Sequence, residues 1–291
     1  MTVEFVTFLG QNPTFYLTLL VIVGLLVGSF LNVVIYRLPI MMEREWRRDC
    51  LEFLEQPETS EHKKFNLLVP RSRCSHCGHQ ITAVENIPVI SYLILGRKCS
   101  ACQTPIPMRY PLLELLTAIM TAVVGWHFGV TVQALAALAL TWSLITLSDI
   151  DIGHKLLPDS ITLPLMWLGI LLSFGDVFIS LEDSVIGAIA GYLSLWSVFM
   201  LFKLLTGKEG MGYGDFKLLA VLGAWIGWEM LLVIILTSSA VGALVGITMI
   251  LLKVNQRGTQ IPFGPYLAAA GWITLIWGEE ILHSYYSFSG L

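Results

Sequence analysis

The segment Gly212–Trp228 reads GYGDFKLLAVLGAWIGW and places a carboxylate beside an apolar helix. Asp215 stands where the run from Phe216 to Trp228 is expected to enter a membrane. An ionisable side chain at membrane depth is costly and points to a functional site. The alternative is helix capping, because Asp is a favoured N-cap residue and Asp215 precedes the expected helix. The local sequence leaves both interpretations open.

A second acidic cluster, Asp149-Ile-Asp151, lies at the end of another apolar helix earlier in the chain. Two carboxylates at close range cannot both ionise cheaply, so one holds a proton while the other is ionised. This is the acid–base chemistry of an aspartic protease. The two clusters therefore predict a protease site.

Composition indicates a membrane protein. The chain is 55% hydrophobic and 13% charged, with a mean hydropathy of +0.73, whereas a soluble domain carries about 25% charged residues. Apolar runs of membrane-spanning length recur along it. We therefore expect an all-α polytopic membrane protein with about eight transmembrane helices and one large loop after the first. The expected spans are 14–35, 111–126, 130–147, 158–177, 184–205, 215–228, 230–252 and 261–277.

Basic residues partition to one side of this eight-span arrangement. All seventeen Lys and Arg fall on that side, eleven of them between Arg37 and Arg109. The opposite loops at 127–129 and 176–183 contain none. Because cytosolic loops carry an excess of Lys and Arg, we expect both termini outside and the basic loops in the cytosol. The short sixth span is decisive, since without it Lys253 and Arg257 would lie outside.

Glycine pairs of the small-xxx-small type occur in four of the expected spans. Such pairs let helix backbones approach closely in lipid, although chance is the alternative where Gly is frequent. We take them as support for a compact helix bundle. The pairs are Gly24/Gly28, Gly187/Gly191, Gly223/Gly227 and Gly242/Gly246.

Four cysteines of the basic loop form two CxxC pairs, Cys74-Ser-His-Cys77 and Cys99-Ser-Ala-Cys102. Two such pairs at this separation are typical of a four-thiolate zinc site, in which each turn supplies one edge of a tetrahedron. Disulfides are the alternative, but thiols stay reduced in the cytosol, where we place the loop. We expect one structural zinc ion bound by Cys74, Cys77, Cys99 and Cys102. His76 is a candidate substitute ligand, and Cys50 is expected to be an ordinary free thiol.

Six motifs follow one another along nearly the whole chain. They are GSFLNVVIYRLP at 28–39, PVISY with LGR at 88–92 and 95–97, RYPLLEL at 109–115, DIGHKLLPD at 151–159, GYGD at 212–215 and IPFGPY at 261–266. In this order, together with the four cysteines, they are highly specific. The chain resembles the bacterial type IV prepilin peptidases, the bifunctional leader peptidase/N-methyltransferases of pilus and type II secretion systems.

The resemblance implies that Asp151 and Asp215 are the catalytic aspartates. Asp215 lies in the GxGD motif shared with other intramembrane aspartyl proteases, and Asp151 stands seven residues before Pro158. Asp149 is the competing neighbour, and Asp159 is expected to be the N-cap of the fourth span. The implied reaction is cleavage of type IV prepilin or pseudopilin leaders at the cytosolic face of the bacterial inner membrane.

The family's second activity is methylation of the new N-terminal amine with S-adenosylmethionine. No glycine-rich strand–turn–helix signature for this cofactor is found in the loop, so the expectation rests on the resemblance. The candidates for this site are Gly96, Arg97 and Glu114. Gly96 can adopt conformations that other residues avoid, and Arg97 offers a forked donor. Glu114 either favours the helix dipole from the first turn or lies near the amine.

Three segments are expected: residues 1–36 as the first transmembrane helix, 37–110 as the cytosolic zinc loop with the methyltransferase region, and 111–291 as a seven-helix peptidase bundle. Two other functions stay open. One is a peptidase whose zinc loop is only structural. The other is an ion-coupled transporter, which predicts carboxylates near the membrane midplane. The expected partners are prepilin substrates and the lipid bilayer, with no nucleic acid.

Overall fold

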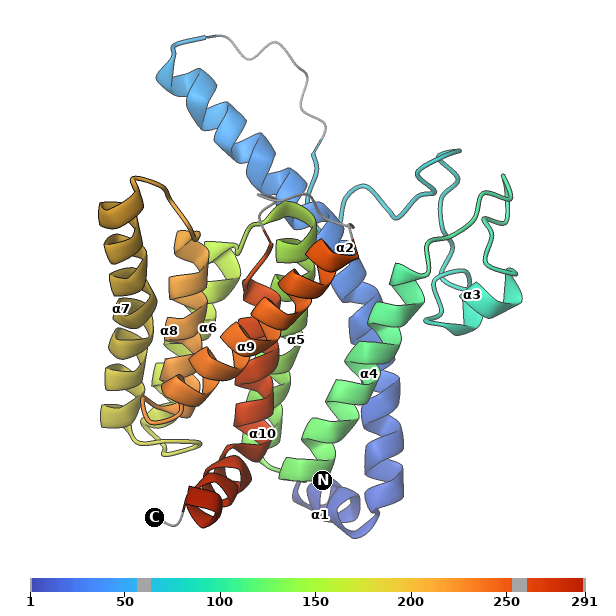
Figure 1. The fold of residues 1–291 in the computed structure, drawn as a ribbon. Helices are drawn as coiled ribbons and strands as arrows, with labels where there is room; N and C mark the ends of the chain where they lie inside the picture. Colours follow the sequence, from blue (N-terminus) through green and yellow to red (C-terminus); the bar gives the residue numbers. More distant parts are fainter. Residues whose placement is uncertain (1, 57–63, 253–260, 290–291) are drawn as a thin grey trace. The chain divides into compact units, whose positions relative to one another are not determined.

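The computed structural model describes residues 2–56, 64–252 and 261–289, and these form ten helices (Figure 1). Within these ranges there is no strand, only two isolated β-bridges, so the predicted all-α class is confirmed. Two compact units divide at Ala134. The first holds α1 Thr2–Gln11, α2 Pro13–Phe53, α3 Ile90–Ile94 and α4 Arg109–Phe128. The second holds nearly all of α5 Val132–His154, then α6 Asp159–Ser173, α7 Leu181–Thr206, α8 Tyr213–Ile226, α9 Leu231–Leu251 and α10 Gly264–Ser289.

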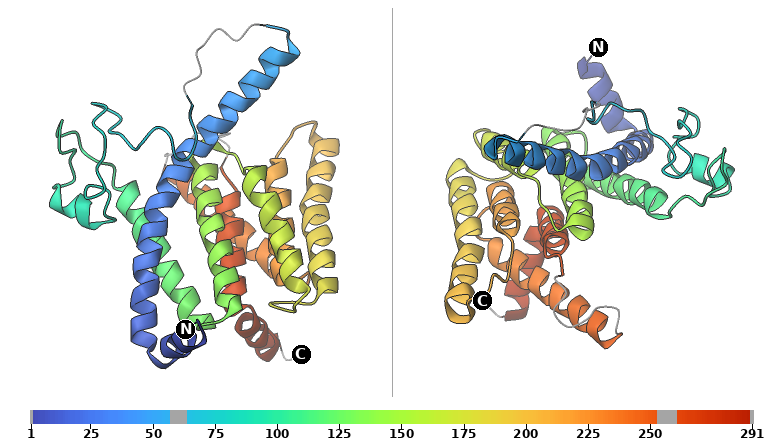
Figure 2. Two further views of the ribbon diagram at one scale, coloured as in Figure 1. Left: turned by 180° about the vertical axis from the view of Figure 1, so that it is seen from behind. Right: turned by 90° about the horizontal axis from the view of Figure 1, so that it is seen from above.

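In the first unit, α2 and α4 pack side by side along their length (Figure 2). A Cβ added to Gly24 would lie 2.6 Å from the Cα of Ala118, and one added to Gly28 would lie 2.8 Å from the Cα of Glu114. These backbone contacts require glycine on α2 and bring Glu114 close to it. The close packing expected of the Gly24/Gly28 pair is confirmed.

Helix α2 is longer than the expected span, because it continues through Pro39 to Phe53. Near its middle, Arg37 is 6% exposed. Its guanidinium donates to the carbonyl oxygens of Asn66 at 2.8 Å, Leu67 at 3.3 Å and Pro70 at 2.5 Å. This clamp fixes the start of the cysteine segment, residues 64–108, to α2.

In the second unit, α8 is the central helix and packs against α6, α7 and α10. Glycines again permit the closest contact: a Cβ on Gly187 would lie 2.2 Å from the carbonyl oxygen of Gly223, and one on Gly191 would lie 2.5 Å from that of Leu219. Gly227 is the C-cap residue of α8 with φ +90°, and its carbonyl carbon would lie 3.1 Å from a Cβ on Gly187. Burying α8 on several sides holds its first turn in a fixed position.

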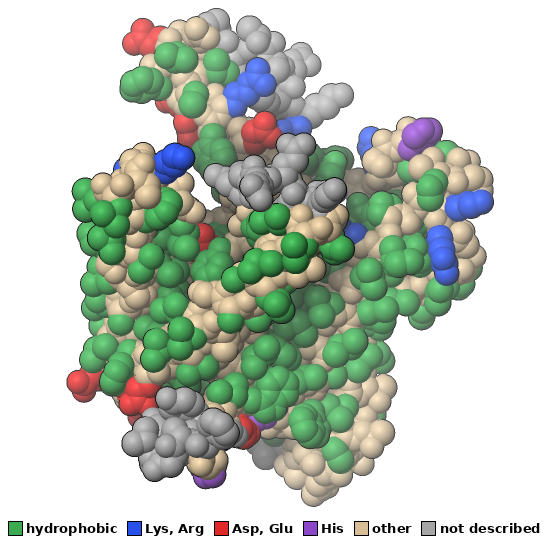
Figure 3. Space-filling model, viewed as in Figure 1, with side chains coloured by type: hydrophobic (Ala, Val, Ile, Leu, Met, Phe, Trp, Pro, Cys, Tyr) green, Lys and Arg blue, Asp and Glu red, His purple; other side chains and the backbone are tan. Residues whose placement is uncertain are grey.

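Five helices are long and apolar enough to cross a membrane: α2, α4, α5, α7 and α9. Their outer faces expose large apolar side chains, which Figure 3 shows covering the visible surfaces of α7 and α9. Helix α6 is apolar but shorter, and α8 is only roughly 21 Å long at 1.5 Å per residue. The eight-span count therefore stays a prediction. Lys253 and Arg257, on which the expected topology depends, lie outside the described residues.

Candidate active site and metal centre

Asp215 lies inside α8. The helix begins at Tyr213 with Gly212 in the N-cap position, so Asp215 is its third residue, and it is 8% exposed. The N-cap interpretation of this carboxylate is therefore wrong, because the helix starts earlier than the apolar run suggests. A Cβ on Gly214 would lie 2.8 Å from the Cβ of Leu157, so the glycine before Asp215 permits close approach of the chain that follows α5.

Asp151 lies near the end of α5 and is 5% exposed. Its Oδ2 accepts a hydrogen bond of 3.0 Å from the backbone N–H of Gly264. Gly264 is the first residue of α10, so the positive end of that helix faces the carboxylate. A Cβ on Gly264 would lie 2.7 Å from Asp151 Oδ2. Sequence reasoning quoted the motif around Gly264 but missed this contact, which joins two segments far apart in the chain.

The structure brings Asp151 and Asp215 together from α5 and α8. Both are buried, and their charges interact. Asp149, the competing neighbour, is half-buried. The arrangement offers two interacting carboxylates, each beside a helix N-terminus: Asp215 in the first turn of α8 and Asp151 at the start of α10.

Asp159 is placed differently from the expectation. The N-cap position of α6 is Pro158, and Asp159 is the first residue of that helix. Both oxygens of the Asp159 carboxylate lie 2.7 Å from Nζ of Lys217. The N-cap interpretation of Asp159 is wrong because this residue lies inside α6, and its carboxylate pairs with a cation on α8 instead. This pair ties α6 to the helix that carries Asp215.

Four thiols gather in the cysteine segment. The sulfur atoms of Cys74, Cys77, Cys99 and Cys102 all lie within 4.8 Å of one another. Cys74 Sγ lies 3.8 Å from Cys102 Sγ, and Cys77 Sγ lies 3.9 Å from Cys99 Sγ. A tetrahedron with Zn–S bonds of about 2.3 Å has edges of about 3.8 Å. The cluster therefore has the dimensions of a four-thiolate metal site, and all four thiols are free rather than disulfide-bonded.

The two CxxC turns have the same backbone geometry. The N–H of Cys74 donates to the carbonyl of His79, and the N–H of Cys99 donates in the same way to Thr104. Gly78 and Gln103 occupy equivalent positions with φ +73° and +59°. Sequence reasoning missed this repeat because a Gln stands where the first turn has a Gly. Two equal turns present their thiols to one centre.

Glu85 ties the two turns together. Its carboxylate accepts hydrogen bonds from the Ser100 hydroxyl in the second turn and from the backbone N–H and hydroxyl of Thr82. These bonds, the Ser100 bond first, lower the pKa of Glu85 to about 2. His76 is not among the four clustered thiol ligands, and Cys50 is exposed on α2 away from them.

Two of the three candidates for a methyl-donor site, Gly96 and Arg97, lie in the cysteine segment, and the third, Glu114, lies on α4. Gly96 has φ +59°, the left-handed conformation expected of it, and Arg97 follows with φ +66°. Glu114 is not in the first turn of α4, because that helix begins at Arg109. The expectation that it serves the helix dipole from the first turn is therefore wrong. Instead, Glu114 Oε2 accepts a 2.8 Å hydrogen bond from the backbone N–H of Val89.

Comparisons with known proteins agree across both units. Residues 22–128 match the bacterial peptidase A24 N-terminal domain, and residues 138–247 match the type IV leader peptidase family. A prepilin leader peptidase/N-methyltransferase of Stutzerimonas stutzeri is 56% identical over 98% of this chain and 99% of its own length. A protein of the same description from Pseudomonas aeruginosa is 54% identical over 97% of this chain and 98% of its own length. No solved structure matches. The chain belongs to the type IV leader peptidase family.

Proposed function

We propose that this protein cleaves the leader peptide of type IV prepilins or pseudopilins and methylates the new N-terminus with S-adenosylmethionine. The observation that supports cleavage is the buried pair Asp151 and Asp215, whose charges interact. The relatives that carry the N-methyltransferase description cover 98% and 97% of the chain. When bound, S-adenosylmethionine supplies a methyl group carried on a sulfonium.

The geometry favours unequal roles for the two aspartates. The Asp151 carboxylate accepts a hydrogen bond from the backbone N–H of Gly264 at the start of α10, and this donor favours the ionised form of Asp151. We therefore assign Asp151 as the general base that takes a proton from the attacking water. Asp215 then holds the shared proton and donates it to the carbonyl oxygen as the tetrahedral intermediate forms. The hydrolysis needs no metal at the carboxylates.

Purified full-length protein in detergent, a synthetic prepilin and S-adenosylmethionine test this function. We expect mass spectrometry to detect mature pilin at the mass of the cleaved chain plus one methyl group. Without S-adenosylmethionine, the same reaction should give cleaved but unmethylated pilin. A protein that never methylates cleaved pilin would be a peptidase alone, and one that leaves the prepilin intact would contradict the proposal.

We further propose that Cys74, Cys77, Cys99 and Cys102 hold one structural zinc ion, because four thiolates close the coordination shell. Elemental analysis should find about one zinc per chain. Replacing Cys77 and Cys102 with Ser should release the metal and make the cysteine segment more sensitive to protease, while cleavage at Asp151 and Asp215 continues. Cys50→Ser is the matched control and should keep the metal. Full zinc content in the double variant would show that other residues hold it.

The protein is proposed to lie in the bacterial inner membrane with the cysteine segment in the cytosol, because basic residues gather there. Cys50 provides a natural label, since it is exposed on α2. In cells with a permeabilised outer membrane, an impermeant maleimide should not reach Cys50 until the inner membrane is broken. A Glu182→Cys variant in a Cys50→Ser background should label before that. Labelling of Cys50 while the inner membrane is still intact would show that the topology is the opposite of the one proposed.

A further inference from the structure

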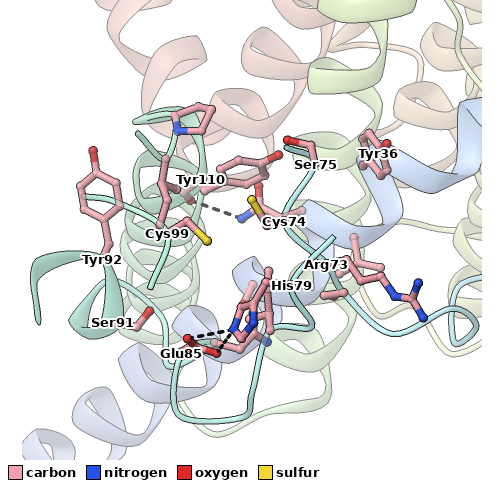
Figure 4. Close-up of a pocket in the computed structure, with 18 of the residues that line it drawn as sticks. Tyr36, Arg73, Cys74, Ser75, His79, Glu85, Ser91, Tyr92, Cys99 and Tyr110 are labelled. Carbon is pink, nitrogen blue, oxygen red and sulfur yellow. Dashed lines mark hydrogen bonds and ion pairs between the residues drawn. The ribbon is translucent and has the colours of Figure 1, made fainter. Parts of the chain in front are cut away.

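A pocket in the first unit belongs to neither the carboxylate pair nor the thiol centre alone. It has a volume of about 480 Å³ and lies between α2, the cysteine segment and the start of α4 (Figure 4). This volume is in the usual range for small-molecule sites. The Arg37 clamp and the four-cysteine turns form part of its wall, so the fold of the segment shapes it. The proposed hydrolysis uses none of the residues that line it.

Glu114 is the unusual residue of this pocket. It is 8% exposed, and the backbone N–H of Val89 that donates to it is a neutral partner. The close approach of Gly28 fixes the backbone of Glu114, and the hydrogen bond from Val89 fixes its carboxylate in the wall of the pocket. Arg37 also lines the pocket, but its guanidinium is bonded to the carbonyls of the cysteine segment. A buried carboxylate is expensive without a partner of opposite charge, so the pocket is suited to a cation.

Four aromatic side chains also line the pocket. Tyr36 from α2, Phe65 and Tyr92 from the cysteine segment, and Tyr110 from α4 all line the pocket. Cations bind over aromatic faces, and nucleic-acid bases stack on aromatic side chains. Figure 4 shows Tyr36 and Tyr110 on the helices beside Cys74 of the cysteine segment. The lining therefore combines two carboxylates, the buried Glu114 and the half-buried Glu85, with flat apolar surfaces, which fits a small cation that carries a ring system.

We propose that this pocket binds S-adenosylmethionine, with Glu114 as the residue that balances its sulfonium charge and Tyr36 as one of its aromatic contacts. This inference rests on the proposed methylation and names its site. S-adenosylmethionine joins a purine to a sulfonium, which is the combination the lining favours. Arg71 and Arg73 also line the pocket, at exposed positions, and suit the carboxylate of the same molecule. Gly96 and Arg97 are not among the lining residues, so we assign them no contact with the cofactor.

Binding by the purified full-length protein tests the proposal without relying on activity. Titration calorimetry would use S-adenosylmethionine and S-adenosylhomocysteine, which lacks the sulfonium charge. We expect Glu114→Gln to weaken the binding of S-adenosylmethionine by about tenfold or more, the scale of one lost charged contact. The binding of S-adenosylhomocysteine should weaken clearly less. Tyr36→Ala should weaken both ligands to a similar extent. Tyr36 is 60% exposed, so its removal leaves no core cavity.

Glu52→Gln, at an exposed position on the same α2, is the matched control and should bind both ligands as the wild type does. Leader cleavage by each variant shows that it is folded. Wild-type affinity in both Glu114→Gln and Tyr36→Ala would show that the cofactor does not bind in this pocket. The proposed function would still stand if the wild-type protein methylates pilin. Equal losses for the two ligands in Glu114→Gln would contradict its charge role. A wild-type protein that neither binds the cofactor nor methylates pilin would refute the methylation itself.

Discussion

Asp151→Asn and Asp215→Asn should each remove leader cleavage, with a loss of roughly 10²–10⁴-fold or more, the usual worth of a general acid or base. An amide keeps the size of the side chain but neither takes a proton from water nor carries the shared proton. In the Asp151→Asn variant, the oxygen of the new amide can still accept the N–H of Gly264, so the fold should persist. Single-turnover cleavage by the purified variants measures the effect, and thermal melting reports the fold.

Asp149→Asn is the matched control, because it makes the same chemical change two residues away on α5. Asp149 is half-buried whereas Asp151 is 5% exposed. We expect Asp149→Asn to retain cleavage within a few-fold of wild type. Normal cleavage by Asp151→Asn together with loss of cleavage in Asp149→Asn would mean that Asp149, not Asp151, is the base.

The thiol centre could be predicted from the sequence because its information is local. Each CxxC turn places two thiols on one edge by backbone geometry alone, and two turns complete the set. The close helix packing at the glycines of α2 and α7 could also be predicted, since a small residue every fourth position permits close helix contact. In both cases the spacing along the chain contains the geometry, and the structure agrees with it.

The contacts of Asp151 and Glu114 could not be predicted in this way. Asp151 meets Gly264, and Glu114 meets Val89, across separations in sequence that only the tertiary fold closes. Propensity gave no sign that α10 begins beside a carboxylate. The two capping interpretations failed for a related reason. The composition of the apolar run does not fix the first residue of a helix, so Asp215 and Asp159 each lie inside the helix they were expected to cap.

Gly264→Ala should reduce leader cleavage by about two orders of magnitude, although this residue carries no functional group. The new Cβ would lie 2.7 Å from Asp151 Oδ2 and 3.2 Å from Leu157 Cδ2, so either the carboxylate or the start of α10 must move. A misplacement of about 1 Å in a catalytic group can cost roughly 10²-fold. The shift would also lengthen the hydrogen bond from the N–H of Gly264, which favours the ionised form of Asp151. Loss should therefore appear in the rate of cleavage rather than in substrate affinity.

Gly278→Ala is the control on the same helix, because its added Cβ meets only ordinary contacts of 3.4 Å with Met230 and Thr274. Single-turnover kinetics over a range of prepilin concentrations would separate rate from affinity for both variants. Methylation of a pilin supplied already cleaved should be unchanged by Gly264→Ala, since every residue assigned to that reaction lies in the other unit. Wild-type cleavage by Gly264→Ala would show that Asp151 tolerates displacement, and would remove the start of α10 from the mechanism. Equal loss of cleavage and methylation would instead indicate general unfolding, which the melting temperature of each variant would detect.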